Sequence, residues 1–479
     1  MNVQGRAVSV IGAAKSGLAA ARTLAELGAR VLVSDIQPAE KLRGAFAKAG
    51  VPSSVEIEGG GHSERVLQAD FIVLSPGVPT DIPILREASR RGIPIHSEIE
   101  IAYRLSKGRR LVVTGSNGKT TTTTLLAKFC EAQFSNVFLG GNIGIPMMEF
   151  AARTGDDAVQ VLEVSSFQLE TISQFTPDIA IITNFFENHL DRYPSYDSYR
   201  AAKERIALNM TGARVLILNA DQESMHELSG RVGCRKAWFG WELDGRRPGV
   251  TMRGDAFVYI REDGTETELF DRKSVKIIGR HNCENIMAAS LAALLAGVEP
   301  SRLERVVAEF AGVEHRLEWV RDRSGVTWIN DSKGTNCAAS IIALRACTPP
   351  VVLIAGGRDK GTDLSEWVAT MRGRVRNVVL YGEARERFRA AMRATPIGMA
   401  LITRGGTFLQ VNSALCRMLR RDEEALLGTS ITSLTHEGDR CVDLEMWNLL
   451  HSGSVESVTR DKRLVDADGA TVWVQNALA

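Results

Sequence analysis

Most of the chain alternates between short apolar runs and longer amphipathic runs. Residues 7–12 (AVSVIG) and 29–35 (ARVLVSD) are apolar runs of strand length, and residues 17–28 between them show helical apolar spacing. The same order recurs downstream, with predicted strands at 69–79, 109–115, 159–166, 177–184, 213–221, 326–332, 350–357 and 376–383. Strands that alternate with helices predict parallel sheets covered by helices on both faces.

The pattern divides the chain into four segments. Residues 1–107 predict a Rossmann-like domain, 108–313 a P-loop-type central domain, and 314–392 a third, shortened Rossmann-like domain. Residues 393–479 change character, because short strands and amphipathic stretches replace the long α/β alternation. A length of 479 residues fits three or four domains.

Composition excludes several classes of protein. The 58 basic and 57 acidic residues give a net charge of +1, so any anionic ligand must be held by local sites. The chain has no leader-like start and no stretch near the ~20 apolar residues of a membrane helix, which predicts a cytoplasmic protein. Its seven cysteines are scattered and never spaced C-x-x-C, which favours reduced thiols.

Residues 112–126 (VVTGSNGKTTTTTLL) place a glycine turn between a strand and a helix. The N–H groups of such a turn bind phosphate, Lys119 can reach the β- and γ-phosphates, and the Thr120 hydroxyl can ligate Mg²⁺. A full P-loop has glycine where Val113 stands, so Gly115 makes this a shortened T-G-x-x-G-K-T form. A plain glycine turn is the alternative, and the flanking strand and helix disfavour it.

Residues 12–17 (GAAKSG) vary the dinucleotide fingerprint G-x-G-x-x-G, and Asp35 ends the next predicted strand. Taken alone, this motif equally predicts a nucleotide-type ligand or close packing of a helix on a strand.

Several reactive side chains follow later strand ends. Glu163 ends an apolar run and can hold Mg²⁺, His189 and Asp191 follow the next run, and Lys203 lies on a predicted helix. Each alone is more often an edge carboxylate, a loop histidine or a solvated lysine. Together they favour a site, because ligands of open α/β sheets bind at this edge.

These stretches together resemble the Mur ligases, and within them the branch that joins D-glutamate to UDP-N-acetylmuramoyl-L-alanine. The resemblance covers residues 1 to about 390. The matching motifs are TGSNGKTTT (114–122), GGNIG (140–144), EVSSFQLE (163–170), TNFFENHLDRY (183–193), YRAAKERI (199–206), GRHNCENIMAA (279–289), EHRLEWV (314–320), INDSKGTN (329–336) and AGGRDKGTDL (355–364).

The resemblance implies three binding regions. The ATP site would comprise Gly115, Ser116, Asn117, Gly118, Lys119, Thr120, Thr121, Asn282, Asn285, Arg316, Asp331 and Lys333. The UDP-substrate would contact Lys15, Ser16, Asp35, Ile36, Gln37, Gly77, Asn142 and His189. D-Glutamate would contact Thr335 and Lys360. The family has Thr-Arg where Ile36-Gln37 stands, so an arginine contact is lost or supplied elsewhere.

By the same resemblance, Lys119, Glu163, His189 and Lys203 would be catalytic, and Thr120, Glu163, His189 and Lys203 would surround two Mg²⁺ ions. Lys203 would carry a carbamate made from CO₂, which turns a cation into an anionic ligand. ATP would convert the substrate carboxylate into an acyl phosphate, which the amine of D-glutamate would attack to form an amide.

The last 87 residues resemble a PAS sensor domain instead of the family's own ending. The strand, Gly-Gly hairpin and helix of residues 396–419, the L-L-G-x-S of 426–430 and a hairpin turning at Asp468-Gly469 carry this likeness. The motif L-S-P-x-x-A-S-x-D-x-F, which helps relatives hold D-glutamate, is missing from the sequence. An unusual completion of the third domain is the alternative.

The missing ending predicts that the chain binds ATP and UDP-substrate but ligates weakly or not at all. It also predicts exposed apolar faces on the third domain unless the tail covers them. The tail would contact a small ligand or a protein; no flavin-linking or haem motif is present. A ligase-derived regulatory protein and a recombined gene are the alternatives to an enzyme.

Overall fold

The structure is a computed structural model that describes residues 1–186, 192–359, 361–394, 400–403, 405–441 and 458–478. The chain forms two compact units, Met1–Val313 and Glu314–Ala479. Among the helices of the described ranges, none combines the length and the apolarity that crossing a membrane requires.

The first unit opens with a parallel sheet of order β3-β2-β1-β4-β5. Its strands are Ala7–Ile11, Arg30–Asp35, Glu56–Gly59, Phe71–Leu74 and Ile95–Ser97, numbered β1 to β5 in chain order. Helices α1 (Lys15–Glu26) and α2 (Ala39–Ala49) pack on one face, and α3 (Pro83–Arg90) packs on the other. The predicted helices on both faces of a parallel sheet are therefore present.

A nine-stranded sheet of order β14-β13-β12-β11-β10-β9-β6-β8-β7 follows. Its strands β6 to β14 are Arg109–Thr114, Val137–Gly141, Val159–Glu163, Ile179–Ile182, Gly212–Asn219, Cys234–Phe239, Gly249–Arg253, Ala256–Ile260 and Glu266–Asp271. The strands β7, β8, β6, β9, β10, β11 and β12, taken in their order across the sheet, pair in parallel. The remaining pairs, β12 with β13 and β13 with β14, are antiparallel. The apolar-run pattern did not predict this antiparallel extension.

Helices cover both faces of the central sheet. α5 (Lys119–Glu131), α10 (Arg280–Leu295) and α11 (Pro300–Glu309) share one apolar core. α6 (Met148–Ala151), α7 (Ser166–Leu169) and α9 (Glu223–Arg231) pack on the other face, in a core that runs through α4 (Glu98–Leu105) into the first sheet. This shared core explains why the two sheets form one unit.

The third segment has two short sheets. The antiparallel pair is β15 (Glu318–Arg323) with β16 (Val326–Asn330), and the parallel pair is β17 (Val351–Gly356) with β18 (Val375–Tyr381). Helices α12 (Cys337–Ala346), α13 (Ser365–Met371) and α14 (Arg385–Ala394) pack against β17 and β18.

The opposite face of β17 and β18 is exposed and apolar. Val352, Ile354, Val379 and Tyr381 lie on it, each 52% to 59% exposed. Alternating strand residues point to opposite faces, and apolar residues on both faces are typical of a sheet covered on both sides. The exposed apolar face expected from the missing ending is therefore present.

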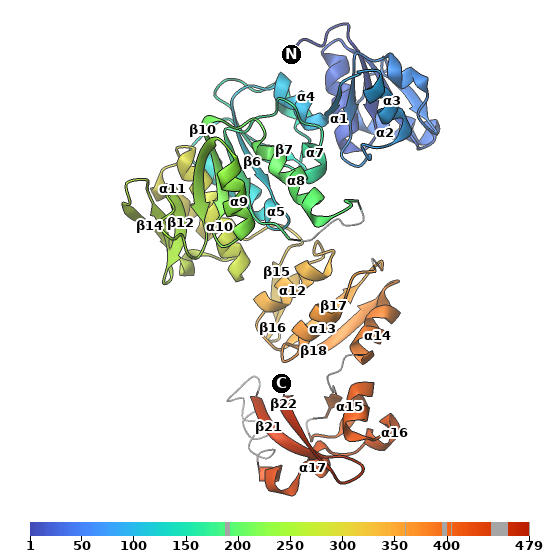
Figure 1. Cartoon of the computed structure of the whole chain (residues 1–479), viewed down its shortest axis with the longest axis vertical. Helices are drawn as coiled ribbons and strands as arrows, with labels where there is room; N and C mark the ends of the chain where they lie inside the picture. Colours follow the sequence, from blue (N-terminus) through green and yellow to red (C-terminus); the bar gives the residue numbers. More distant parts are fainter. Residues whose placement is uncertain (187–191, 360, 395–399, 404, 442–457, 479) are drawn as a thin grey trace. The chain divides into compact units, whose positions relative to one another are not determined.

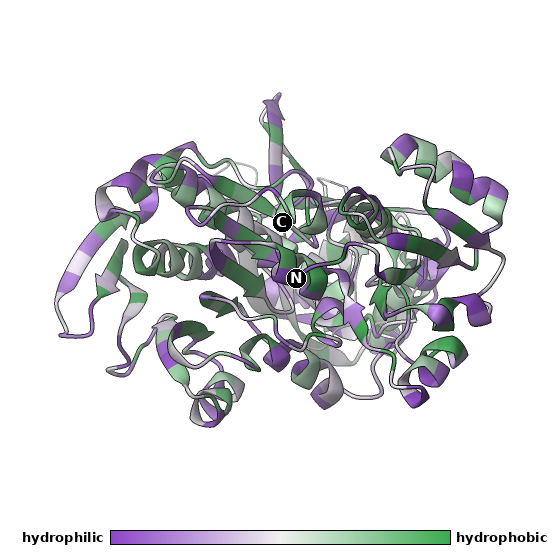
Figure 2. Cartoon of the chain, turned by 90° about the horizontal axis from the view of Figure 1, so that it is seen from above, coloured by the Kyte–Doolittle hydropathy of each residue, from purple (hydrophilic) through white to green (hydrophobic). Residues whose placement is uncertain are grey.

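The C-terminal segment, coloured red in Figure 1, has its own small core of buried apolar side chains. It contains β19 (Ala400–Ile402), β20 (Phe408–Val411), α15 (Ser413–Leu419), α16 (Glu423–Leu426), α17 (Ile431–Leu434), β21 (Val458–Val465) and β22 (Thr471–Leu478). β21 and β22 pair antiparallel, and Gly469 in their connection has φ +82°, a conformation that favours glycine. Coloured by hydropathy, several helices of the chain carry both hydrophilic and hydrophobic residues, as expected of helices packed on one side (Figure 2).

Candidate active site

The glycine turn of residues 115–118 joins the end of β6 to the start of α5. Gly115 and Gly118 have φ of +140° and +80°, and a Cβ at either would collide with Thr183 or Asn285. Glycine is therefore required at both positions for the backbone to turn between its neighbours. Lys119 is the first residue of α5, and its Nζ donates to the Ser116 carbonyl at 3.0 Å.

The Glu163 carboxylate lies beside this turn, at the end of β8. It is 2% exposed and accepts hydrogen bonds from the Thr120 hydroxyl and the Asn142 amide, both at 2.8 Å. The structure thus brings together three residues that the sequence placed in metal and substrate sites. A carboxylate with hydroxyl and amide oxygens nearby offers the oxygen ligands that Mg²⁺ prefers.

Lys203 lies on α8 (Tyr196–Glu204) and is only 2% exposed. Burial lowers the pKa of its amine well below the usual value, and the nearby positive charge of Lys119 lowers it further. Glu163 acts in the opposite direction without cancelling the shift. The amine is therefore held toward its neutral, nucleophilic form, next to the glutamate and lysine of the phosphate turn.

Tyr199 connects α8 to the phosphate turn. Its hydroxyl donates to Ser116 Oγ at 3.1 Å, and its ring lies 4.7 Å from Lys203 Nζ. Burial raises the pKa of this phenol to about 12, so it remains a hydrogen-bond donor at neutral pH.

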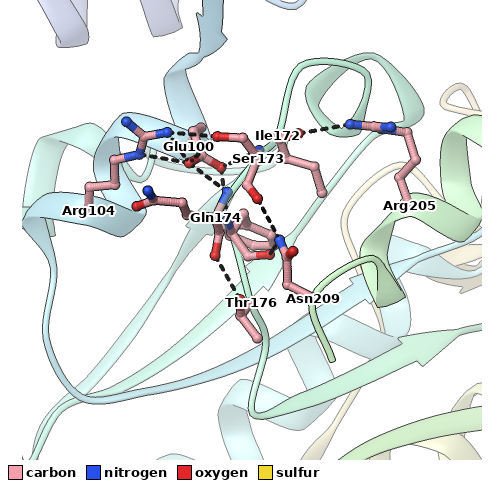
Figure 3. A network of polar contacts seen from close by, with 9 residues as sticks. Glu100, Arg104, Ile172, Ser173, Gln174, Thr176, Arg205 and Asn209 are labelled. Atoms are coloured by element: carbon pink, nitrogen blue, oxygen red, sulfur yellow. Dashed lines mark hydrogen bonds and ion pairs between the residues drawn. The ribbon is translucent and has the colours of Figure 1, made fainter. Parts of the chain in front are cut away.

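The loop after α7 is held from two sides (Figure 3). On one side, the Glu100 carboxylate of α4 accepts the backbone N–H groups of Ser173, Gln174 and Phe175 at 2.9–3.0 Å, and Arg104 donates to it at 2.7 Å. On the other side, two residues that follow Lys203 in the chain donate to loop carbonyls: Arg205 to Leu169 and Ile172, and Asn209 to Ser173 and Phe175. The network therefore ties α4 to the helix that carries Lys203.

Replacing Glu100 with glutamine should destabilise the first unit by about 2–4 kcal/mol, because an amide cannot accept all these donors. Burial alone raises the pKa of Glu100, but the three backbone donors and Arg104 outweigh it and lower the pKa below 4.5. Its stabilisation is therefore complete above pH 4.5 and disappears as the pH falls through the lower folded-state value. Calorimetric transition temperatures of Glu100→Gln and wild type should converge below pH 4.5.

Glu87 provides a matched control for that substitution. Its carboxylate also accepts from two arginines, Arg90 and Arg91, but on the surface of α3. Glu87→Gln should leave the transition temperature nearly unchanged, because exposed ion pairs contribute little. Equal losses in the two variants would contradict a special role for the Glu100 network.

Asn282 and Asn285, predicted for the nucleotide, lie on the first turns of α10 beside the phosphate turn. Asn285 Oδ1 accepts from the Thr122 hydroxyl at 3.3 Å, and Asn285 Nδ2 donates to Asn282 Oδ1 at 3.1 Å. The structure thus brings both residues to α5, within the same unit.

The remaining nucleotide residues belong to the second unit. Asp331 follows β16, and its Oδ1 accepts the Leu317 N–H at 3.0 Å. Burial raises the pKa of Asp331, whereas this hydrogen bond and the Arg316 guanidinium lower it in part. Arg316 lies between His315 and Leu317, which both have left-handed φ (67° and 44°). Such strained backbone is a marker of functional turns. Lys333 and Thr335 are exposed on the following loop.

A cavity of about 290 Å³ lies between the first sheet and the central sheet. Four of the residues predicted for the UDP-substrate line it: Lys15, Ser16, Gly77 and Asn142. Lys15 also donates across the cavity to the Gly144 carbonyl. Asp35, Ile36 and Gln37 are not among its lining residues; Asp35 instead accepts the N–H groups of Ala13 at 2.6 Å and Gln37 at 2.8 Å.

Family comparisons match all three α/β segments. A model described as "Mur ligase MurD-like, N-terminal domain" matches residues 6–97, "Mur ligase middle domain" matches 113–293, and "Mur ligase, glutamate ligase domain" matches 315–421. A UDP-N-acetylmuramoylalanine–D-glutamate ligase of Acidobacterium capsulatum is 40% identical over 415 residues, covering 86% of this chain and 89% of the relative. This chain belongs to the Mur ligase family.

Other relatives agree. The ligase of the same description from Koribacter versatilis is 39% identical over 398 residues, covering 83% of this chain and 87% of its own. Among solved structures, UDP-N-acetylmuramate–alanine ligase of Thermotoga maritima has a TM-score of 0.51 at 20% identity, covering 81% of this Mur ligase and 88% of that chain. A pseudomurein peptide ligase of Methanothermus fervidus scores 0.50 at 19% identity, covering 81% and 87%. These two show the shared fold.

The C-terminal segment of this Mur ligase matches a different family. A model described as "PAS fold" covers residues 386–478, so residues 386–421 are matched by both this model and the glutamate ligase domain. The predicted PAS resemblance is confirmed.

Three predicted or candidate residues, His189, Asp191 and Lys360, lie outside the described residues. Among the residues that the structure does describe, no group of three or more His, Cys, Asp or Glu is arranged to hold a metal. Sequence reasoning missed Gln168, which lines the cavity, is 1% exposed and has a buried Nε2 without a partner. Its signal was the position five residues after Glu163 in the motif EVSSFQLE.

Proposed function

We propose that this Mur ligase uses ATP to join D-glutamate to UDP-N-acetylmuramoyl-L-alanine, a step of peptidoglycan synthesis. The observation that carries the proposal is 40% identity to a UDP-N-acetylmuramoylalanine–D-glutamate ligase over 86% of the chain. The regulatory alternative is not favoured, because the similarity extends through all three ligase domains.

The phosphate turn provides the ATP end of the reaction. The N–H groups of residues 115–118 and the start of α5 would hold the phosphate chain, and Lys119 would neutralise charge on the transferred phosphoryl group. Thr120 and Glu163 fit a magnesium site, because their oxygens lie 2.8 Å apart in a buried position. Bound Mg²⁺ would supply charge neutralisation to the phosphates, and a second Mg²⁺ would lie toward Lys203.

The surroundings of Lys203 support the proposal that this lysine is carbamylated. Burial shifts the Lys203 amine toward its neutral, nucleophilic form, and attack of that form on CO₂ would form an N–C bond and release one proton, leaving an anionic carbamate. The positive charge of Lys119 disfavours a protonated amine at Lys203. The same charge would attract an anionic carbamate at that position. The carbamate would then complete the set of oxygen ligands begun by Glu163.

The acceptor substrate would occupy the cavity lined by Lys15, Ser16, Gly77 and Asn142, and Asn142 also donates a hydrogen bond to Glu163. D-Glutamate would contact Thr335 and Lys360 of the third domain, which we delimit at 314–392. We expect a raised KM for D-glutamate and weak ligation, because the family's last strands and D-glutamate motif are replaced by the PAS segment of residues 393–479. A contact of this segment with a small ligand or a protein, and a cytoplasmic location, remain part of the proposal.

Mass spectrometry of the product tests the proposal. Purified chain, ATP, Mg²⁺, UDP-N-acetylmuramoyl-L-alanine and D-glutamate should yield the UDP-muramoyl dipeptide, with L-glutamate as the control substrate. A complete absence of dipeptide at saturating D-glutamate, from a protein that binds both ATP and the UDP-substrate, would overturn the assignment as a ligase.

A further inference from the structure

Arg192 joins the central domain to the wall of the cavity. It lies between β9 and α8 in the chain, and its guanidinium donates to three consecutive carbonyls of the first domain: Pro76 at 3.2 Å, Gly77 at 3.4 Å and Val78 at 3.0 Å. Pro76 and Gly77 line the cavity. One side chain of the central domain thus holds the first-domain loop that forms the opposite wall of the cavity.

The same guanidinium packs on an aromatic cluster through the ring of Phe167. The cluster consists of Phe167, Tyr193, Tyr196, Tyr199 and the side chain of Ala202. Arg192 lies 4.2 Å from the Phe167 ring, which stacks on Tyr193 with 5.7 Å between centroids and 6° between planes. Tyr193 contacts Tyr199 edge-on at 5.4 Å. Because Phe167 precedes Gln168 on α7 and Tyr199 reaches Ser116, the cluster connects Arg192 to the cavity and to the phosphate turn.

We propose that Arg192 is a positioning residue that fixes the distance between the two walls of the UDP-substrate cavity. The inference rests on the proposed function for the identity of the substrate. Arginine suits the task, because its planar fork can donate to several carbonyls at once while its face stacks on an aromatic ring. Lysine has a single mobile ammonium and cannot reproduce both contacts.

Arg192→Met should raise the KM for UDP-N-acetylmuramoyl-L-alanine about tenfold to a hundredfold, as expected from losing charged hydrogen bonds. The KM values for ATP and D-glutamate should stay within about twofold, because the carbonyls that Arg192 holds belong to the first domain, whereas the phosphate turn keeps its own hydrogen bond with Tyr199. Arg192→Lys should show an intermediate KM for the UDP-substrate. A KM that rises for the UDP-substrate alone indicates a positioning role. General damage to the fold would instead raise the KM for all three substrates.

Arg246→Met is the matched control. Arg246 also lies over an aromatic ring, 5.4 Å from Trp238, and donates to a backbone carbonyl, Leu243 at 3.2 Å, but its contacts stay between β11 and β12. It should leave all three KM values at wild-type levels. Equal rises for all three substrates in Arg192→Met, or an unchanged KM for the UDP-substrate, would overturn the proposal.

Isothermal calorimetry separates this inference from the ligase assignment. The affinity of the full chain for UDP-N-acetylmuramoyl-L-alanine, measured without ATP or D-glutamate, should fall in the order wild type, Arg192→Lys, Arg192→Met. That order supports the positioning role even if no dipeptide forms. Equal affinities across the three proteins overturn the role even if wild type is an active ligase.

Discussion

Lys119→Ala should lower ATP turnover by about a thousandfold or more, the scale expected when a preorganised charge at a phosphoryl transfer site is lost. Lys119 begins α5, directly after the glycine turn, and Thr120 beside it bonds to Glu163. Alanine is a good helix former, so the substitution keeps α5 and removes the positive charge of the Lys119 side chain. The measurement is ADP release that depends on the UDP-substrate and D-glutamate.

Lys128→Ala is the control for that substitution. Lys128 lies on the same helix, is exposed and pairs with Glu131 at 2.8 Å. It should retain wild-type turnover, since an exposed ion pair contributes little. Comparable turnover by Lys119→Ala and Lys128→Ala would show that the glycine turn does not handle phosphate in this chain.

The α/β alternation of the first two segments could be predicted because apolar runs mark strands buried on both faces. Strands β12, β13 and β14 were not predicted, because they follow one another without intervening helices and pair antiparallel at one end of the sheet; β14 also reads ETELFD, which is only partly apolar. Periodicity detects burial, and strands with one exposed face or polar ends give a weaker pattern.

The candidate site was predictable where a side chain able to bind metal or substrate follows directly on the end of a predicted strand. Glu163 ends β8 and meets Thr120 and Asn142, as the shared edge of a parallel sheet requires. The roles of Glu100 and Arg192 were not predictable, because three of the hydrogen-bond partners of each are backbone groups 73 or more residues away in the chain. Backbone acceptors and donors leave no sequence signal, so only the fold reveals such contacts.

Lys203→Met should abolish ligation and, in CO₂-free buffer, raise the thermal transition temperature. Methionine fills a similar volume without an amine, and burying a polar group that lacks a full set of hydrogen bonds costs about 1–3 kcal/mol, which the substitution removes. In a unit of this size each kcal/mol corresponds to about 2–4 °C. Calorimetry and the dipeptide assay on the same preparations measure both effects.

The pH dependence of stability tests whether the buried amine of Lys203 causes this difference in transition temperature. Because burial holds the pKa of Lys203 well below 10.5 in the folded state, the unfolded chain binds more protons between those two values. Wild-type stability in CO₂-free buffer should therefore rise with pH across this window and level off near 10.5, whereas Lys203→Met should lack this component. Adding ¹³C-bicarbonate should stabilise wild type alone and produce a carbamate carbon signal by NMR. A Lys203→Met chain less stable than wild type in CO₂-free buffer would contradict a buried neutral amine, and with it the physical basis for carbamylation.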